Sequence, residues 1–338
     1  MPGPFQSRVV RISATSWGDT TLIREAIAFA QKIAATEAVV TLRGESGTGK
    51  ELFARAIHTA SGRSGPFVPV NCAALPEQLL ESELFGYEGG AFTGGKRQGK
   101  SGLFEIAGDG TVFLDEIAEM SPGSQAKILR TIQENAIRRV GGTEEIPIHC
   151  RVITATNRNL KRMVDENAFR NDLYYRINVL PIHVPPLRER LKDIPALVDH
   201  FLFQLAAGLG KTFQCFTPRA LDKLSRHGWP GNVRELKNVV ERAAIVCEDE
   251  SVDVDSVLFS HELESGMGVS GRRACRLQSG SSLKEQVGDF ERELIHAALE
   301  RAVSIRGAAR TLRISHTALL KKMRKYGMGP VTNRTSGQ

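Results

Sequence analysis

Residues 38–57 read AVVTLRGESGTGKELFARAI, and this stretch decides the fold of the larger part of the chain. It joins an apolar run at 38–42 to a glycine-rich turn and then to apolar positions at helical spacing, Leu52 to Ile57. The turn matches GxxxxGK between a strand and a helix, which is typical of a phosphate-binding loop; a glycine-rich loop without nucleotide is the alternative. Backbone N–H groups and the helix start bind phosphate, and Lys50 neutralises its charge. We therefore predict a nucleoside triphosphate site formed by Gly44, Glu45, Ser46, Gly47, Thr48, Gly49 and Lys50.

Further apolar runs alternate with helical patterns along the next 140 or so residues. They lie at 67–70, 111–114, 151–155 and 179–182, and a helical pattern at 20–35 precedes the first strand. Strands separated by helices predict an α/β fold with a doubly wound, mostly parallel sheet. From Leu187 to about Glu248 only helical signals remain, including Thr217 as a cap before a first-turn proline. These signals predict a separate helical lid.

Two acids follow the apolar run at 112–114. Asp115 and Glu116 would lie at the carboxyl edge of the sheet, where ligands of open α/β sheets bind. Glu51 follows Lys50 where the general motif has the Ser or Thr that ligates Mg²⁺, so we assign the metal to Asp115. Glu116 is then the expected general base for the attacking water. An acid pair after a strand is often only a solvated loop, but the phosphate loop favours ATP hydrolysis.

Five blocks of sequence occur in a characteristic order. They are GESGTGKE at 44–51, ESELFGYEGGAFTGG at 81–95, GTVFLDE at 110–116, FRNDLYYRINV at 169–179 and WPGNVRELKNVVERA at 229–243. Together they resemble the AAA+ domain of sigma-54-dependent transcriptional activators, the bacterial enhancer-binding proteins. That family also has Glu after the lysine, so the resemblance adds Glu51 to the ATP-binding set. It implies an ATPase that uses ATP and Mg²⁺ to convert closed complexes of sigma-54 RNA polymerase holoenzyme into open ones.

The block at 90–95 has the composition of a mobile, tightly turned loop with an aromatic ring and a hydroxyl at its tip. A glycine-rich surface turn is the plain alternative. The family's motif is GAFTGA, and its Phe and Thr contact the sigma factor, so the resemblance gives Phe92 and Thr93 that role. Gly95 replaces the final alanine. The expected sigma-contacting loop comprises Gly90, Ala91, Phe92, Thr93, Gly94 and Gly95.

Other residues receive roles through the resemblance alone. Asn71 is similar to the residue that restrains the catalytic glutamate, although it could equally cap a strand end. Thr156 and Asn157 occupy the sensor position that would read the γ-phosphate, with turn capping as the alternative.

Three arginines also match family positions. Arg170 and Arg176 resemble arginine fingers that act on a neighbouring subunit's nucleotide, whereas surface ion pairs are the alternative. Arg234 resembles the second sensor, in the first turn of a helix for which Asn232 is the expected N-cap. Fingers acting in trans require a closed ring of identical subunits, and the resemblance implies a homo-hexamer.

The C-terminal end of the chain is strongly basic. Eight basic residues and no acid lie between Arg301 and Lys325, although the whole chain has a net charge of +7. Helices at 307–312 and 316–326 around a turn predict a helix-turn-helix with Leu319, Met323 and Tyr326 in its core. The segment resembles the factor-for-inversion-stimulation module and, more closely, its tyrosine-repressor variant; a packing helix without a DNA role is the alternative. The expected contacts to double-stranded upstream DNA are Ser315, as N-cap, His316, Thr317, Leu320, Lys321 and Arg324.

These observations predict an AAA+ core at 15–186, a helical lid at 187–248, a linker at 249–282 and an all-α helix-turn-helix domain at 283–330. Five cysteines without a CxxC pair indicate reduced thiols, and the lack of a signal peptide or apolar span indicates a cytoplasmic protein with no membrane partner. About fifteen residues precede the core, which leaves no room for a sensory domain. Control by a regulatory protein in trans, or truncation of the chain, is the expected explanation.

Two other functions fit parts of the pattern. One is a tyrosine-repressor-like regulator that uses the AAA+ fold for oligomerisation and sensing without melting a promoter. The other is an AAA+ ATPase for DNA remodelling or replication loading, which would lack a sigma-contacting loop between Asn71 and Asp115. The GAFTGG block at 90–95 favours the activator.

Overall fold

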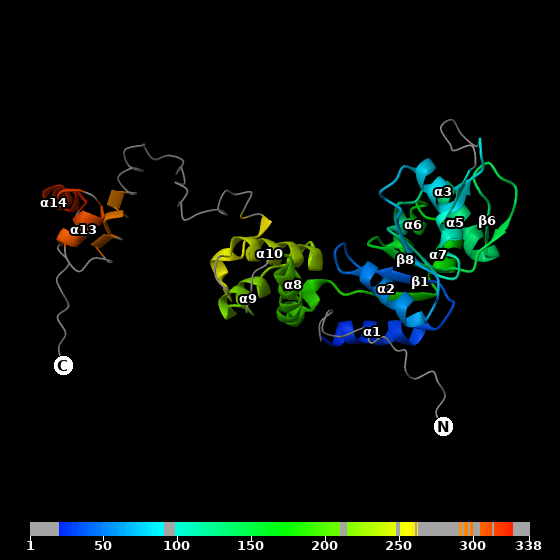
Figure 1. Cartoon of the computed structure of the whole chain (residues 1–338), viewed down its shortest axis with the longest axis horizontal. Helices are drawn as coiled ribbons and strands as arrows, with labels where there is room; N and C mark the ends of the chain where they lie inside the picture. The colour runs from blue at the N-terminus through cyan, green and yellow to red at the C-terminus, as the bar shows by residue number, and fades with distance from the viewer. Residues whose placement is uncertain are drawn as a thin grey trace, which may run out of the picture. The chain divides into compact units, whose positions relative to one another are not determined.

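The computed structural model describes residues 20–90, 99–209, 215–247, 251–260 and 262, and residues 291–326 except 293, 297, 300–304 and 313. The chain divides after His261 into two compact units. The first unit holds an α/β core and a helical lid, and the second includes the helices of a helix-turn-helix (Figure 1).

Five parallel strands form the central sheet of the first unit. Their order is β2-β5-β8-β1-β9, and each lies within two residues of a predicted strand. The strands are β1 (Val40–Arg43), β2 (Phe67–Asn71), β5 (Thr111–Asp115), β8 (Arg151–Thr156) and β9 (Leu180–His183). The prediction of a parallel, doubly wound sheet is confirmed.

Apolar side chains on both faces of this sheet are buried by helices. In β5, Phe113 packs against one cluster, whereas Val112 and Leu114 pack against the other, as alternation along a strand requires. The first face is covered by α1 (Thr21–Ala34) and α2 (Lys50–Ser61), which lie next to each other in Figure 1. The second face is covered by α3 (Glu77–Phe85), α4 (Leu103–Ala107), α5 (Pro122–Glu134), α6 (Leu160–Asp165) and α7 (Asn171–Ile177).

Two short strand pairs extend from the second face. β3 (Gly86–Tyr87) pairs with β4 (Lys100–Ser101), and β6 (Ala136–Ile137) pairs with β7 (Ile146–Pro147). β3 and β4 flank the predicted sigma-contacting loop. Gly90 has φ +86°, which favours glycine, whereas Ala91, Phe92, Thr93, Gly94 and Gly95 lie outside the described residues.

The lid begins with two 3₁₀ turns, η4 (Leu187–Glu189) and η5 (Leu191–Asp193), and packs around Trp229, which is fully buried. The predicted cap is confirmed, because Thr217 Oγ1 accepts a hydrogen bond from the Ala220 N–H at 3.3 Å. The other lid elements are α8 (Ile194–Leu209), α9 (Pro218–Ser225), α10 (Asn232–Val246), β10 (Cys215–Phe216), β11 (Ser251–Val252) and η6 (Val254–Ser256).

The lid core also includes residues beyond the predicted boundary at 248. Val252, Val257 and Phe259 are buried in the same cluster as Trp229, and β11 pairs with β10. Residues 251–260 were expected in the linker because their apolar positions follow no helical period. The short strand β11 and the 3₁₀ turn η6 contain too few residues to show a periodic pattern of apolar positions.

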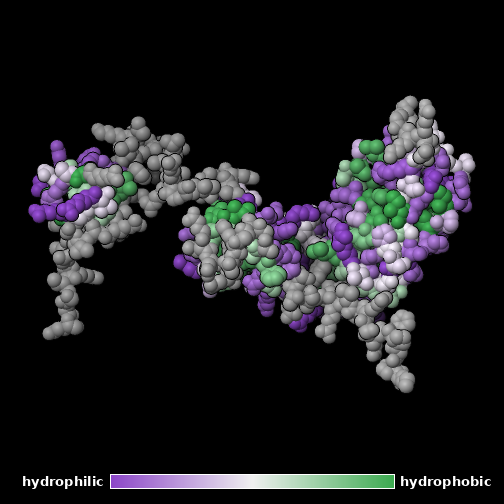
Figure 2. All heavy atoms as spheres, in the orientation of Figure 1, coloured by the Kyte–Doolittle hydropathy of each residue, from purple (hydrophilic) through white to green (hydrophobic). Residues whose placement is uncertain are grey.

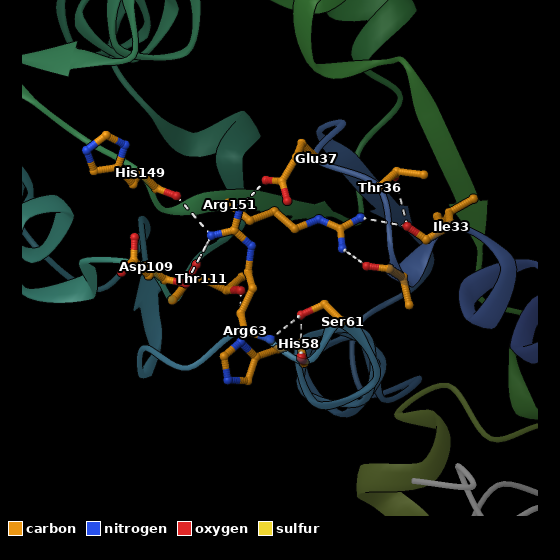
Figure 3. A network of polar contacts seen from close by, with 12 residues as sticks. Ile33, Thr36, Glu37, His58, Ser61, Arg63, Asp109, Thr111, His149 and Arg151 are labelled. Carbon is orange, nitrogen blue, oxygen red and sulfur yellow. Dashed lines mark hydrogen bonds and ion pairs between the residues drawn. The ribbon is translucent and has the colours of Figure 1, made fainter. Parts of the chain in front are cut away.

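Two arginines connect the ends of α1 and α2 to the sheet: Arg151 begins β8, and Arg63 follows α2 (Figure 3). Arg151, only 1% exposed, donates from Nη1 to the Ala34 carbonyl at 2.5 Å and from Nη2 to the Ile33 carbonyl at 3.0 Å. Arg63 donates to the carbonyls of Asp109 and His149 at 3.0 and 2.9 Å. Arg151 thus caps the carbonyl end of α1, where a cation is favourable.

Substituting Arg151→Met should destabilise the first unit by about 1–3 kcal/mol, because methionine keeps the unbranched apolar stem but leaves the Ala34 carbonyl without its donor. Burial offsets part of the arginine's benefit, since desolvation lowers the pKa of Arg151 to about 10. Urea unfolding followed by circular dichroism measures the change. Arg138→Met, at an exposed arginine, should shift stability by less than about 0.5 kcal/mol. Equal midpoints for the two variants would contradict this account of α1 capping.

The second unit contains α13 (Ile305–Thr311) and α14 (His316–Lys325). Ser315 caps α14 as predicted, since its Oγ accepts a hydrogen bond from the Ala318 N–H at 3.1 Å. Leu319 and Met323 are buried against Ala308 and Ala309, and Tyr326 packs at the edge of this cluster. The predicted helix-turn-helix and its core are therefore confirmed.

Candidate nucleotide site and DNA interface

The phosphate loop joins β1 to α2 at the carboxyl edge of the sheet. Gly49 has φ +101° and precedes Lys50, the first residue of α2. Gly47 has φ +78°, and a Cβ atom there would lie 2.3 Å from the Gly231 carbonyl oxygen of the lid. Glycine is therefore required at 47 both by the backbone turn and by the close approach of the lid.

Lys50 is nearly buried, with 6% of its surface exposed. Its Nζ donates to the carbonyls of Gly44 and Glu45 at 3.0 and 3.1 Å, and it lies 4.0 Å from Glu116 Oε1. Burial lowers the pKa of Lys50, and the carboxylates of Glu116 and Asp115 oppose that change. The charge is thus held between the loop and the two acids at the end of β5 and directly after it.

Glu116 occupies a strained position directly after β5. It is a non-glycine residue with φ 53° and ψ 48°, a conformation that side chains rarely adopt and that clusters at functional sites. Its N–H donates to Asp115 Oδ1 at 3.0 Å, and its Oε2 accepts from the Asn157 N–H at 3.3 Å. The structure therefore brings together Lys50, Glu116 and Asn157, which the sequence predicted for one site.

Asp115 fits the predicted role of magnesium ligand. Protein sites usually bind Mg²⁺ through one or two carboxylates, with substrate phosphates and waters completing the shell. In the part of the chain that the structure describes, no group of three or more His, Cys, Asp or Glu side chains could form a complete metal cage. A single carboxylate beside a phosphate loop is the donor set expected for a metal that arrives with the nucleotide.

Three other predicted residues make local contacts. Asn71 lies opposite Asp115 in the sheet, but its Oδ1 accepts from the Ala73 N–H at 2.9 Å. Thr156 Oγ1 accepts from the Arg158 N–H at 3.0 Å. Glu51 forms an exposed ion pair with Arg55 at 2.8 Å. For Asn71 and Thr156 these contacts are the capping roles that we gave as alternatives, and the functional roles of Asn71, Thr156 and Glu51 stay predictions.

Asn232 is not the N-cap that we predicted. It is the first residue of α10, with φ 53°, and Gly231 holds the cap position. Its side chain is completely buried and instead accepts from the Leu187 N–H at 2.8 Å and donates to the Ser46 carbonyl at 3.0 Å. Glu235 satisfies the helix end, since its Oε2 accepts from the Gly231 N–H at 2.8 Å. The amide is therefore available to join the lid to the phosphate loop.

Arg234 lies in the first turn of α10 and reaches the phosphate loop, as predicted. Its Nη1 donates to Ser46 Oγ at 3.0 Å, and its backbone N–H donates to the Gly47 carbonyl at 3.2 Å. Two arginines that the sequence did not indicate also reach this loop. Arg188 binds the Glu45 carboxylate at 2.7 Å, and Arg190 donates to the Thr48 carbonyl at 3.0 Å.

Arg170 and Arg176 are exposed at α7. Arg170 forms a two-point contact with Asp172, at 3.0 and 2.7 Å, and Arg176 donates to the Ile132 carbonyl at 2.9 Å. Their exposure leaves both guanidinium groups accessible to another molecule.

The predicted DNA-contacting residues share the accessible face of α14. His316, Thr317, Lys321 and Arg324 are exposed, and Leu320 is partly buried. Hydrophilic side chains predominate on the face of this unit that Figure 2 shows. Lys322, also on α14, is not among these predicted contacts, and its ammonium group forms an ion pair with Glu291. A positive helix face of this kind can bind the phosphate backbone while its first turn reaches base edges.

Among the described helices, none has the length and apolar character needed to cross a bilayer.

Comparison with known proteins identifies three domain families along the chain. Residues 17–183 match the Sigma-54 interaction domain, residues 188–266 match the AAA+ ATPase lid domain, and residues 280–329 match a helix-turn-helix domain. Regulatory protein AtoC of Escherichia coli (strain K12) is 45% identical over 305 residues, which cover 88% of this chain and 65% of AtoC. Transcriptional regulatory protein ZraR of Klebsiella oxytoca is 44% identical over 308 residues, which cover 90% of this chain and 68% of ZraR. The chain therefore spans about two thirds of the length of these relatives.

Solved structures agree with this assignment. NtrX from Brucella abortus in complex with ADP has a TM-score of 0.67 and 35% identity, with 92% of this chain and 69% of NtrX covered. NtrX has also been solved in complex with ATP, with a TM-score of 0.64 and 34% identity over 92% of this chain and 68% of NtrX. The AAA+ fold, the lid, the C-terminal helix-turn-helix and the extent of these matches show that the chain belongs to the family of sigma-54-dependent transcriptional regulators.

Proposed function

We propose that this protein is an ATP-dependent transcriptional activator. It binds upstream DNA through α14, assembles into a ring, and remodels closed complexes of sigma-54 RNA polymerase into open ones. The observation that carries the proposal is the convergence of Lys50, Glu116 and Asn157 within a Sigma-54 interaction domain. Passive nucleotide binding would need the phosphate loop, but it would not need a carboxylate held in a strained conformation beside it.

The proposed chemistry follows from the positions of these groups. Lys50 binds and neutralises the outer phosphates, and the backbone N–H groups at the start of α2 hold them in place. Glu116 orients the attacking water and accepts its proton, while the Asn157 backbone keeps that carboxylate in position. Asp115 would hold Mg²⁺, which when bound neutralises charge on the phosphates.

The oligomer and the partners are also proposed from the family and from the surfaces described above. Arg170 and Arg176 are accessible on α7, as residues that complete a neighbour's site must be. The basic face of α14 supplies the charge that DNA binding requires. The residues at 90–95 would transmit the hydrolysis step to the sigma factor.

Promoter opening provides the test of this function. Purified protein, sigma-54 polymerase and a promoter with its upstream binding site are incubated with ATP, and unpaired thymines are mapped by permanganate footprinting. The wild type should open the promoter. Thr93→Ala should hydrolyse ATP within about twofold of the wild-type rate and open little or no DNA, because Thr93 is not among the residues proposed to bind or hydrolyse the nucleotide.

A matched control separates the loss of the proposed sigma contact from a general loss of folded, active protein. Thr59→Ala removes a hydroxyl that donates to the Arg55 carbonyl within α2, and it should open promoters normally. Hydrolysis by the wild type without promoter opening would reject the activator function and favour a tyrosine-repressor-like regulator. Normal opening by Thr93→Ala would reject the role of the loop alone.

A further inference from the structure

The Glu45 side chain of the phosphate loop is directed toward the lid. Its carboxylate forms an ion pair with Arg188 at 2.7 Å, and Oε2 also accepts from Asn232 Nδ2 at 3.1 Å. Arg188 belongs to η4 at the entrance to the lid, whereas Asn232 begins α10. These contacts lower the pKa of Glu45 to about 2, so the carboxylate is charged at neutral pH.

Asn232 makes this contact part of a larger connection. Its completely buried amide also holds the Leu187 N–H and the Ser46 carbonyl. One amide therefore joins η4, α10 and the phosphate loop. If the lid moves away from the core, the bonds from Arg188 and Asn232 to Glu45 and the bond from Asn232 to Ser46 must break together, because each crosses from the lid to the phosphate loop.

We propose that Glu45 is a positioning residue that latches the lid onto the phosphate loop and thereby slows the release of ADP. The inference rests on the proposed nucleotide site and adds a control on its product step. Nucleotides commonly leave such sites only after a lid opens, and opening often limits turnover. Arg188 and Asn232 already donate hydrogen bonds to the Glu45 carboxylate, so we assign this side chain to lid closure rather than to phosphate or metal binding.

The expected size of the effect follows from exposure. The Arg188 and Glu45 side chains are 48% and 41% exposed, so solvent screens the pair and weakens it. Glu45→Gln keeps the shape and a possible contact to Asn232 but removes the charge. We expect ADP to dissociate about two- to fivefold faster from Glu45→Gln and from Arg188→Gln.

The experiment measures dissociation of a fluorescent ADP analogue, mant-ADP, from the full chain by stopped flow with excess unlabelled ADP. The double variant Glu45→Gln/Arg188→Gln should release the analogue no faster than the faster single variant, because both substitutions break one contact. Arg188→Lys keeps the charge but can replace only one point of the two-point contact, so its release rate should lie between those of the wild type and Arg188→Gln. Arg226→Gln, in an exposed lid pair with Asp222, should leave the rate unchanged.

The possible results separate the latch from the nucleotide site itself. Failure of the wild type to bind mant-ADP would reject the proposed site. Binding by the wild type, with release from Glu45→Gln at the wild-type rate, would reject the latch alone. Additive effects in the double variant, or acceleration by Arg226→Gln as large as by Arg188→Gln, would show general loosening of the lid and would also reject it.

Discussion

Substituting Glu116→Gln is expected to lower the rate of ATP hydrolysis by about 10²- to 10⁴-fold while nucleotide binding is retained. Glutamine has nearly the same shape and can still accept a hydrogen bond from the Asn157 N–H, so the strained turn after β5 should persist. It cannot accept a proton from the attacking water. Turnover is measured by phosphate release, and binding is measured by mant-ATP fluorescence.

Glu119→Gln is the matched control for this substitution. Glu119 lies three residues further along the same segment, but its carboxylate pairs with Arg158 at the surface. We expect hydrolysis by this variant to stay within about threefold of the wild type, since exposed ion pairs contribute little. If Glu116→Gln kept wild-type turnover, the base would have to be another group. Loss of mant-ATP binding would indicate a disturbed phosphate loop instead.

The sheet and the central part of the site could be predicted because their signals are local in the sequence. An apolar run, the glycines and Lys50 specify one strand–loop–helix unit, and Asp115 and Glu116 end a strand that is buried on both faces. In a parallel sheet, strand ends meet at one edge, so these groups were expected to converge. Ser315 as the cap of α14 was likewise a local signal.

The contacts between the loop and the lid could not be predicted in this way. Glu45 and Asn232 are 187 residues apart, and no periodicity links them. Asparagine before a helical pattern usually indicates an N-cap, and that interpretation was wrong because Glu235 and Gly231 already satisfy the helix end. Arg188 lies in a run of alternating charges, which by itself indicates a solvated turn. Only the folded chain shows that this turn faces Glu45.

Replacing either Arg170 or Arg176 with alanine is expected to reduce ATP hydrolysis by about 10³-fold or more, since arginine fingers contribute 10³ to 10⁵ in turnover. Both side chains are exposed, and each forms a contact that could be exchanged for a phosphate oxygen: Asp172 for Arg170 and the Ile132 carbonyl for Arg176. Arg162→Ala removes another exposed arginine, paired with Glu166 on α6, and should have little effect. The rate of ATP hydrolysis by all three variants is measured as phosphate release.

Mixing two inactive variants decides whether the fingers act within one subunit or between subunits. The two variants are Arg176→Ala, which keeps Glu116, and Glu116→Gln, which keeps Arg176. An interface in a mixed ring is active when the Arg176→Ala subunit supplies the nucleotide pocket and the Glu116→Gln subunit supplies the arginine finger. Random assembly from equal amounts makes about a quarter of the interfaces active, because each condition is met half of the time in a heterologous ring. Recovery of activity in the mixture therefore requires action in trans. A mixture as inactive as its components would place the finger and the base in one subunit, and the exposure of α7 would then need a different explanation.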